Sequence, residues 1–335
     1  MELSELEKQI IVNSWSFLTE MILEPTIQGG NHTTYFVHTP TNQFVLKIYS
    51  TTTANSQIEY EHSLLFFLQQ ADLSFAIPTP IPTSAGETLI HIATQQRSQK
   101  VALLPQIVGQ SANRRNLHQV QSIGCTLAEL HCVLTEFDPQ GRLARLPYWG
   151  NLAQIHPAIS DPLAIAQVLN LSLEDQTRLN QILVEAIASV PDLYATLPLQ
   201  TIHADYITPN ILVEDDQVVG VLDFEFATFD LKLLDYLSTL DQLASFPWKE
   251  ELFADIVKAF STGYRQRGSL TSLEQESLLT VWRVQRASSL VYWTGLFIEG
   301  KANRQKVVDA VIETLNFETW LTNNSKYFLE LLGFM

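Results

Sequence analysis

The chain has 335 residues, which is longer than most single hydrophobic cores and suggests two structural units. Hydrophobic residues make up 46% of the chain and charged residues 17%, a composition that excludes an intrinsically disordered protein. The formal net charge of −16 argues against nucleic acid as a partner, because binding to a phosphate backbone depends on clustered lysine and arginine.

No targeting segment or membrane span is recognisable in the sequence. Residues 1–7 lack the basic start and the apolar run of a signal peptide, and no stretch of about 18 apolar residues occurs. We therefore expect a cytoplasmic protein without a membrane partner.

The first part of the chain is predicted to form a small antiparallel sheet with one helix packed on it. Its apolar residues switch between the helical period and the alternation typical of strands. The predicted segments are a helix over residues 4–18, strands over 33–39 and 43–49, a helix over 54–70, and strands over 88–94 and 100–108.

After Gly109 the pattern changes to long helices, predicted over residues 117–134, 172–190, 248–266, 272–297 and 303–323. One segment, 199–227, interrupts the helices with two short strands, 210–213 and 218–222. The prediction is an α+β fold with two lobes: a small N-lobe, residues 1–108, built on an antiparallel sheet, and a larger, mostly helical C-lobe, residues 109–335.

The interrupting segment contains the parts that phosphoryl transfer requires, namely metal ligands and a carboxylate that orients the attacking hydroxyl. In His203-Ala204-Asp205-Tyr206-Ile207-Thr208-Pro209-Asn210, the Asp205 carboxylate would accept the hydroxyl proton, and the Asn210 amide oxygen would bind magnesium. Asp223 opens Asp-Phe-Glu after the second strand and is the expected charged metal ligand. Each residue alone would more often be a turn former or a cap, but the joint pattern favours function.

These motifs resemble the aminoglycoside phosphotransferase and choline kinase superfamily. They also resemble type II homoserine kinases, whose catalytic loop commonly has the His-Ala-Asp form. The resemblance covers most of the chain and extends to Gly29-Gly30-Asn31, Val45-Leu46-Lys47, Glu61 and the segment 124–131.

This resemblance implies a protein-kinase-like fold with ATP bound between the lobes. It implies that Asp205 is the catalytic base, that Asn210 and Asp223 bind Mg²⁺, and that Lys47 holds the ATP phosphates. His203 is expected to hold the loop backbone rather than to react, and Asp235 is expected to cap a helix or to support the loop.

Strand alternation gives the N-lobe residues a consistent role. It places Val45 and Lys47 on one face, so that Val45 covers the adenine while Lys47 reaches the phosphates. A buried lysine needs a partner carboxylate, and Glu61 in the next helix is the preferred candidate, with Glu59 as the alternative.

Two further segments are expected to contact the nucleotide. Gly29 and Gly30 allow close approach of the backbone to phosphate, although they do not form the G-x-G-x-x-G of protein kinases. The backbone of the connection between the lobes, residues 103–107 with Leu104 and Gln106, should hydrogen-bond the adenine edge.

The acceptor is expected to be a small molecule. No Ala-Pro-Glu segment follows Asp-Phe-Glu and a helix begins soon afterwards, which leaves little room for a peptide platform. An amino alcohol such as homoserine, choline or an aminoglycoside suits the acidic composition. The residues expected to contact it are Tyr206, Glu225 and Arg286, with Trp149, Trp293 and Asp230 as further candidates.

The sequence therefore predicts an ATP- and Mg²⁺-dependent phosphotransferase that acts on a hydroxyl group. A nucleotide-binding pseudokinase that serves as an interaction module is the alternative, although every expected catalytic position holds a competent residue. A hydrolase that uses Asp223 and Glu225 as a carboxylate pair would require both side chains to face the cleft.

Overall fold

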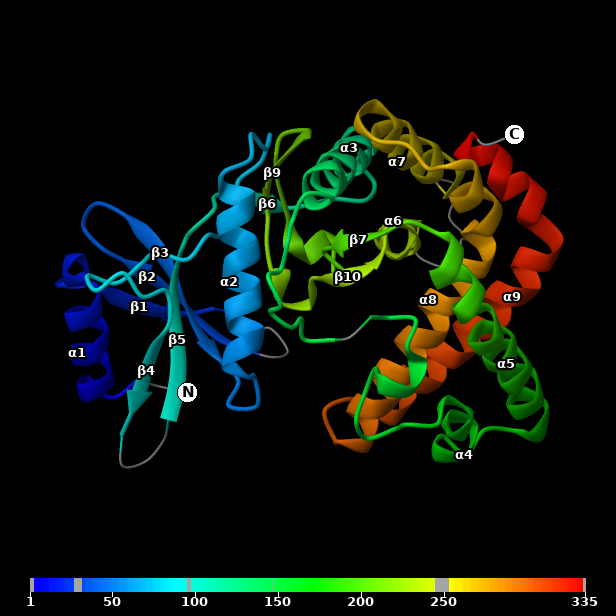
Figure 1. Cartoon of the computed structure of the whole chain (residues 1–335), viewed down its shortest axis with the longest axis horizontal. Coiled ribbons are helices and arrows are strands. Elements are labelled where there is room, and N and C mark those ends of the chain that lie inside the picture. The colour runs from blue at the N-terminus through cyan, green and yellow to red at the C-terminus, as the bar shows by residue number, and fades with distance from the viewer. Residues whose placement is uncertain (1–2, 27–31, 95–97, 147, 245–252, 334–335) are drawn as a thin grey trace.

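The computed structural model describes residues 3–26, 32–94, 98–146, 148–244 and 253–333. It shows two lobes, with the sheet-containing N-lobe on one side and the helical C-lobe on the other (Figure 1). The prediction of an α+β, protein-kinase-like architecture is confirmed. Residues 106–109 join the last strand of the N-lobe sheet to the first strand of the C-lobe, and the predicted boundary after residue 108 falls in this connection.

The N-lobe is a five-stranded antiparallel sheet in the order β1-β2-β3-β5-β4. Its strands are β1 (Ile22–Pro25), β2 (Thr33–His38), β3 (Gln43–Tyr49), β4 (Ile90–Ala93) and β5 (Ser98–Pro105), and its helices are α1 (Glu5–Ser14) and α2 (Asn55–Gln69). Leu46 and Ile48 pack in one apolar cluster with Trp15, which follows α1. Lys47 projects from the opposite face of β3 and reaches Glu61 on α2. The predicted alternation along β3 is therefore confirmed.

The C-lobe is mostly helical, and none of the helices that the structure describes is both long and apolar enough to cross a membrane. Its helices are α3 (Leu117–Leu134), α4 (Ile165–Val168), α5 (Leu173–Thr196), α6 (Lys232–Ala244), α7 (Phe253–Arg267), α8 (Ser272–Ile298) and α9 (Arg304–Leu332). Short strands form two small sheets, β6 (Gln110–Ser111) with β8 (Ile211–Glu214) and β9 (Gln217–Val221), and β7 (Leu199–Ile202) with β10 (Thr228–Leu231).

Several predicted boundaries differ from the structure. Helix α5 continues through Pro191 to Thr196, and α9 continues to Leu332. Strands β1, β7 and β10 were absent from the prediction; each has four residues. The predicted helix over 248–266 begins outside the described residues, and its described part is α7.

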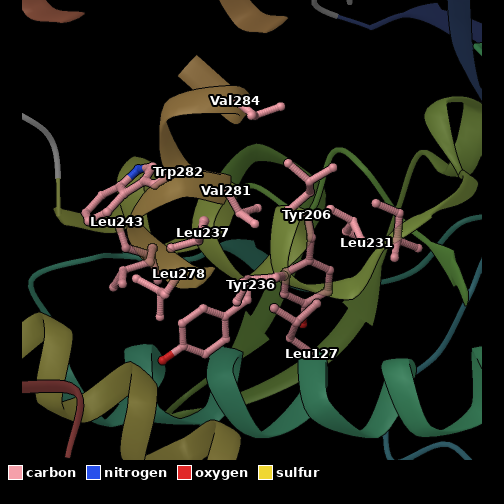
Figure 2. Close-up of a cluster of buried hydrophobic side chains, with 14 of the residues drawn as sticks. Leu127, Tyr206, Leu231, Tyr236, Leu237, Leu243, Leu278, Val281, Trp282 and Val284 are labelled. Atoms are coloured by element: carbon pink, nitrogen blue, oxygen red, sulfur yellow. The ribbon is translucent and has the colours of Figure 1, made fainter. Parts of the chain in front are cut away.

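The C-lobe core lies directly behind the predicted catalytic loop. Figure 2 shows Tyr206, Tyr236 and Trp282 among aliphatic side chains that come from α3, α6 and α8. All three rings are at most 1% exposed. Since Tyr206 follows Asp205 in the chain, burial of its ring anchors the loop to this core.

Helices α3 and α7 cross at two glycines. A Cβ added to Gly124 would lie 2.1 Å from the carbonyl oxygen of Phe260, and one added to Gly263 would lie 1.9 Å from the carbonyl oxygen of Gln121. The two backbones therefore touch where neither residue has a side chain.

Candidate active site

A cleft of about 620 Å³ lies between the lobes and collects most of the residues predicted from the sequence. The predicted residues that line it are Val45, Lys47, Glu61, Leu104, Gln106, Asp205, Asn210, Asp223 and Glu225. Gly29 and Gly30 lie outside the described residues. The cleft thus brings the cation of the N-lobe into the same space as the carboxylates of the C-lobe.

Lys47 forms a buried ion pair with Glu61, with 2.8 Å between Nζ and Oε1. Burial alone would lower the pKa of Lys47, but the negative charges of Glu61 and Asp223, together with Tyr49, outweigh it and raise that pKa well above its ordinary value. The Lys47 side chain therefore stays charged. Glu59, the alternative partner, is exposed.

A second set of contacts fixes the Glu61 carboxylate. The Tyr49 hydroxyl donates to Glu61 Oε2 at 3.2 Å and lies 3.0 Å from His62 Nε2. Burial, and then the charge of Lys47, lower the pKa of His62 to about 3, so its ring is neutral. Because the Tyr49 proton is used toward Glu61, His62 Nε2–H donates to the tyrosine oxygen.

Asp235 holds the predicted catalytic loop, which is one of the two roles expected for it. The two oxygens of Asp235 accept hydrogen bonds from the backbone N–H groups of His203 and Ala204, each at 2.7 Å. Ala204 has a φ of 64°, a conformation that costs a residue with a side chain free energy and turns the loop sharply. Asp235 thus stabilises the strained backbone directly before Asp205.

His203 has a structural role. Its Nδ1 accepts from the backbone N–H of Asp205 at 3.2 Å, so the ring proton lies on Nε2, which donates to the carbonyl oxygen of Leu222 at 3.0 Å. Burial lowers the pKa of His203, in agreement with a neutral ring. The imidazole therefore ties the catalytic loop to the residue before Asp223.

The Asp205 carboxylate is mostly buried in the cleft. Burial, followed by the negative charge of Asp223, raises the pKa of Asp205 to about 7, whereas a hydrogen bond from Asn210 acts in the opposite direction. That bond runs from Asn210 Nδ2 to Asp205 Oδ2 at 2.8 Å. Asp205 therefore changes charge near neutral pH, as suits a general base.

The same hydrogen bond orients Asn210 for a second contact. Its NH₂ group is directed to Asp205, so the amide oxygen is left for another partner, and it accepts no hydrogen bond within the described part of the chain. Asp223 has a φ of 60° and its side chain is 39% exposed, with Oδ1 3.5 Å from Lys47 Nζ.

The donor set of Asn210 and Asp223 fits magnesium. Carboxylate and amide oxygens are the ligands that this cation prefers, and it commonly completes its coordination with water and phosphate. The described residues contain no group of three or more His, Cys, Asp or Glu side chains that would form a metal site without such help. A metal here would therefore depend on the phosphates of a nucleotide.

Glu225 is enclosed by His32 and Arg145, two contacts that the sequence did not suggest. Its Oε2 lies 2.5 Å from His32 Nε2 and 2.7 Å from Arg145 Nη1. Burial opposes ionisation of Glu225, but His32, Lys47 and Arg145 together lower its pKa. His32 lies two residues after Gly30, the second predicted phosphate-binding glycine, which is a weak signal; nothing local marked Arg145.

Two residues predicted to contact the acceptor do not line the cleft. Tyr206 is buried in the C-lobe core, where its hydroxyl lies 2.6 Å from that of Thr126. Arg286 is 7% exposed, bonds to Asp241 and lies over the ring of Phe317. In both cases packing within the helical core accounts for the side chain, which corrects the expectation.

The three further candidates for the acceptor site lie in different places, and none of them lines the cleft. Asp230 is fully buried and accepts from the backbone N–H of Trp149 at 2.6 Å, so it supports that residue rather than a ligand. Trp293 packs under Lys306, whose Nζ is 3.4 Å from the ring centre. Trp149 lines a separate small cavity beside the catalytic loop.

Known proteins provide an independent comparison. A family model described as "Phosphotransferase enzyme family" matches residues 24–270. The homoserine kinase of Methylorubrum populi is 27% identical over 214 residues, which are 64% of this chain and 62% of that relative, so the chain spans less than two thirds of its length. The homoserine kinase of Pseudomonas aeruginosa is 25% identical over 282 residues, 82% of this chain and 80% of that relative.

Solved structures show the same fold at low sequence identity. A microcompartment-associated aminopropanol kinase matches with a TM-score of 0.67 and 18% identity, covering 96% of this chain and 98% of that one. An amicoumacin kinase in complex with AMP-PNP, Ca²⁺ and Ami matches with a TM-score of 0.69 and 14% identity, covering 94% of each chain.

Proposed function

Because the chain belongs to the Phosphotransferase enzyme family, we propose that it is an ATP- and Mg²⁺-dependent kinase that phosphorylates a hydroxyl group of a small amino alcohol. One observation carries the proposal: the Lys47–Glu61 pair of the N-lobe and the Asp205, Asn210 and Asp223 side chains of the C-lobe line a single cleft. Phosphoryl transfer needs these parts in one place.

Each residue has a defined part in the reaction. Lys47, fixed by Glu61, holds the phosphates of ATP. Asp205 takes the proton of the acceptor hydroxyl while the oxygen of that hydroxyl bonds to the γ-phosphorus and ADP leaves. Asn210 and Asp223 would hold Mg²⁺, which, when bound, offsets the negative charge of the phosphates.

The other end of the cleft suits a nucleobase. Val45 and Leu104 are directly paired across β3 and β5, and both line the cleft as apolar walls. The side-chain oxygen of Gln106 is buried in the same cleft without a hydrogen-bond partner among the described residues. An exocyclic amino group of adenine would satisfy this acceptor.

Homoserine is the first acceptor to test. Relatives of the chain bear the name homoserine kinase, and the fold is shared with a kinase of aminopropanol, another small amino alcohol. A peptide acceptor is disfavoured because the chain after Asp223 is short and already paired. The 3-10 turn Phe224–Phe226 is followed by β10, which pairs with β7, and α6 begins at the residue after β10. This arrangement leaves no extended platform between Asp223 and α6.

The test is the release of ADP from ATP and Mg²⁺ in the presence of homoserine, 1-amino-2-propanol, choline or an aminoglycoside. We expect at least one small amino alcohol to stimulate turnover, and Asp205→Asn to reduce the stimulated rate by about 100-fold or more. Binding of Mg-ATP without turnover for any alcohol would instead support the pseudokinase. A carboxylate-pair hydrolase is disfavoured because Arg145 and His32 already occupy Glu225.

A further inference from the structure

A second, smaller cavity lies in the C-lobe beside the catalytic loop. Its volume is about 40 Å³, and its walls include Ala204, the residue before Asp205, and Asp235, which holds the loop. Trp149, Gln285, Ser238 and Ser289 complete the polar part of the wall. Trp149 also packs against Phe226, which lines the nucleotide cleft, so the two spaces share a border.

Two polar atoms of opposite kind are unsatisfied at this cavity. Trp149 Nε1, a donor, and Gln285 Oε1, an acceptor, are both buried and have no hydrogen-bond partner among the described residues. The Gln285 amide is oriented by its NH₂ group, which donates to Ser289 Oγ at 3.4 Å. Because buried polar atoms without partners are destabilising, such a pair in a cavity wall indicates a ligand that supplies both partners.

Trp149 is fixed in place before any ligand binds. Its backbone N–H donates to Asp230 Oδ2 at 2.6 Å, and its carbonyl oxygen accepts from Ser288 Oγ at 2.7 Å. The indole N–H is therefore preorganised, and binding a ligand there requires little ordering of the protein.

The charge of the cavity favours a cation. Asp235 contributes a carboxylate, and no lysine, arginine or histidine is among the described residues that line the wall. The Asp235 oxygens accept two backbone N–H groups and lie near His131 Nε2, at 3.3 Å, but have no lysine or arginine partner in the described chain. An ammonium group would be attracted here, whereas a carboxylate without a compensating cation would be disfavoured deep inside.

We propose that this cavity binds the amino end of the acceptor, with a primary ammonium donating to Gln285 Oε1 and a neighbouring oxygen accepting from Trp149 Nε1. The inference rests on the proposed kinase function and narrows its substrate class. The volume of about 40 Å³ leaves room for only a few heavy atoms, so the cavity takes the ammonium nitrogen and the atoms next to it but excludes the ring of an amino sugar. The trimethylammonium group of choline is disfavoured because it has no N–H to donate to Gln285 Oε1.

Two variants test the proposal with homoserine and 1-amino-2-propanol as probes. Gln285→Met removes the acceptor atom and should raise the KM of both amines about 10-fold or more, the effect of losing one hydrogen bond to a charged group. Trp149→Phe should raise the KM of homoserine, whose carboxylate adjoins the amine, but not that of 1-amino-2-propanol. The KM of ATP should stay within about two-fold in both variants, because each variant removes a contact to the amine acceptor and none to ATP.

Matched controls change the same residue types elsewhere. Gln181→Met alters an exposed glutamine of α5, and Trp293→Phe alters the indole that packs under Lys306. Neither should change the KM of either amine. Gln285→Glu keeps the shape of the side chain and adds a negative charge, so it should lower the KM of both amines even if Gln285→Met folds poorly.

The outcomes separate this proposal from the kinase function itself. Unchanged amine KM values in Gln285→Met and Gln285→Glu, or a choline KM at or below that of homoserine, would overturn the cavity assignment while leaving a working kinase. If no alcohol stimulates turnover, the kinase proposal fails. Calorimetric titration with homoserine then tests separately whether the cavity binds an amine. Homoserine binding that Gln285→Met abolishes supports the subsite, and no binding, or binding that Gln285→Met leaves intact, refutes it.

Discussion

The Nε2 atom of His32 lies 2.5 Å from Oε2 of Glu225, and this hydrogen bond joins the N-lobe to the C-lobe across the cleft between them. The backbone N–H of Ser50 donates to His32 Nδ1 at 3.0 Å, so the ring proton lies on Nε2 and is donated to Glu225. Arg145 binds the same carboxylate oxygen from the C-lobe. The position of the N-lobe segment next to the predicted phosphate-binding glycines therefore depends on Glu225.

This link changes what is expected of Glu225. The sequence suggested that it contacts the acceptor, but its carboxylate is already occupied by His32 and Arg145. We predict that Glu225→Gln raises the KM of ATP about 10-fold, because a charge-assisted contact that aligns the lobes is lost. Steady-state kinetics with both substrates varied provides the measurement, and Glu59→Gln, at an exposed position of α2, is the control. A change confined to the acceptor KM would restore the original assignment.

Asp205→Asn should lower turnover by about 10²- to 10⁴-fold while ATP binding is retained, the usual contribution of a positioned general base. Since the pKa of Asp205 is raised to about 7 by burial and by Asp223, kcat/KM of the wild type should fall as the pH drops below about 7. Wild-type turnover in the variant would remove Asp205 from the mechanism.

The same substitution predicts an effect on stability, with a defined sign. An Asp carboxyl ordinarily titrates near 3.8, and the pKa of Asp205 is about 7 in the folded protein, so the folded state binds more protons between these values. Wild-type stability is therefore lost as the pH rises through this range, and the neutral amide introduced by Asp205→Asn avoids that loss. Without magnesium and nucleotide, the gain in Tm from Asp205→Asn should be larger at pH 8 than at pH 5 by at least about 2 °C in calorimetry.

Asp223→Ala should abolish magnesium-dependent binding of ATP, because it removes the charged member of the predicted metal site. Titration calorimetry with ATP, in the presence of magnesium and in the presence of EDTA, measures the effect. Asp72→Ala, at an exposed position of the N-lobe, should bind as the wild type does. Mg-ATP affinity that survives Asp223→Ala would disprove the metal assignment.

The buried Lys47–Glu61 pair predicts a non-additive double-mutant cycle. Removing one partner leaves the other charge buried, so Lys47→Met or Glu61→Leu alone should destabilise the protein by about 3–5 kcal/mol. The double variant Lys47→Met/Glu61→Leu should be less destabilised than the sum of the two single variants, because no unpaired charge remains. Urea unfolding of the four proteins measures the coupling, and strictly additive changes would show that the pair is not coupled.

Local patterns predicted the elements that local interactions decide. The helix expected over 117–134 coincides with α3, which begins where the Asn116 side chain accepts the N–H groups of His118 and Gln119. Strands β7 and β10 were missed because each has four residues and pairs with a segment far along the chain. The predicted end of α5 before Pro191 was wrong because packing against the C-lobe keeps the helix continuous through the proline.

Among the site residues, too, local patterns predicted some, and others are brought together only by the fold. The spacing within the catalytic loop, and from it to Asp223, identified residues that the structure places together in the cleft, although their roles remain predictions. His32 and Arg145 escaped detection because they meet Glu225 from 193 and 80 residues away in the chain. Only the folded arrangement of the lobes and loops brings those three side chains together.

The contact between α3 and α7 at Gly124 and Gly263 predicts a temperature-sensitive variant of the protein. Gly124→Ala would place a methyl group 2.1 Å from the carbonyl oxygen of Phe260, and neither backbone can retreat without separating two helices of the C-lobe core. Gly268→Ala would come closest to the Ala128 side chain, with 3.0 Å between the two Cβ atoms, and should be milder. With about 1–3 kcal/mol lost to overpacking, Gly124→Ala should behave as a conditional allele that supports activity in cells grown cool and loses it when they are warmed.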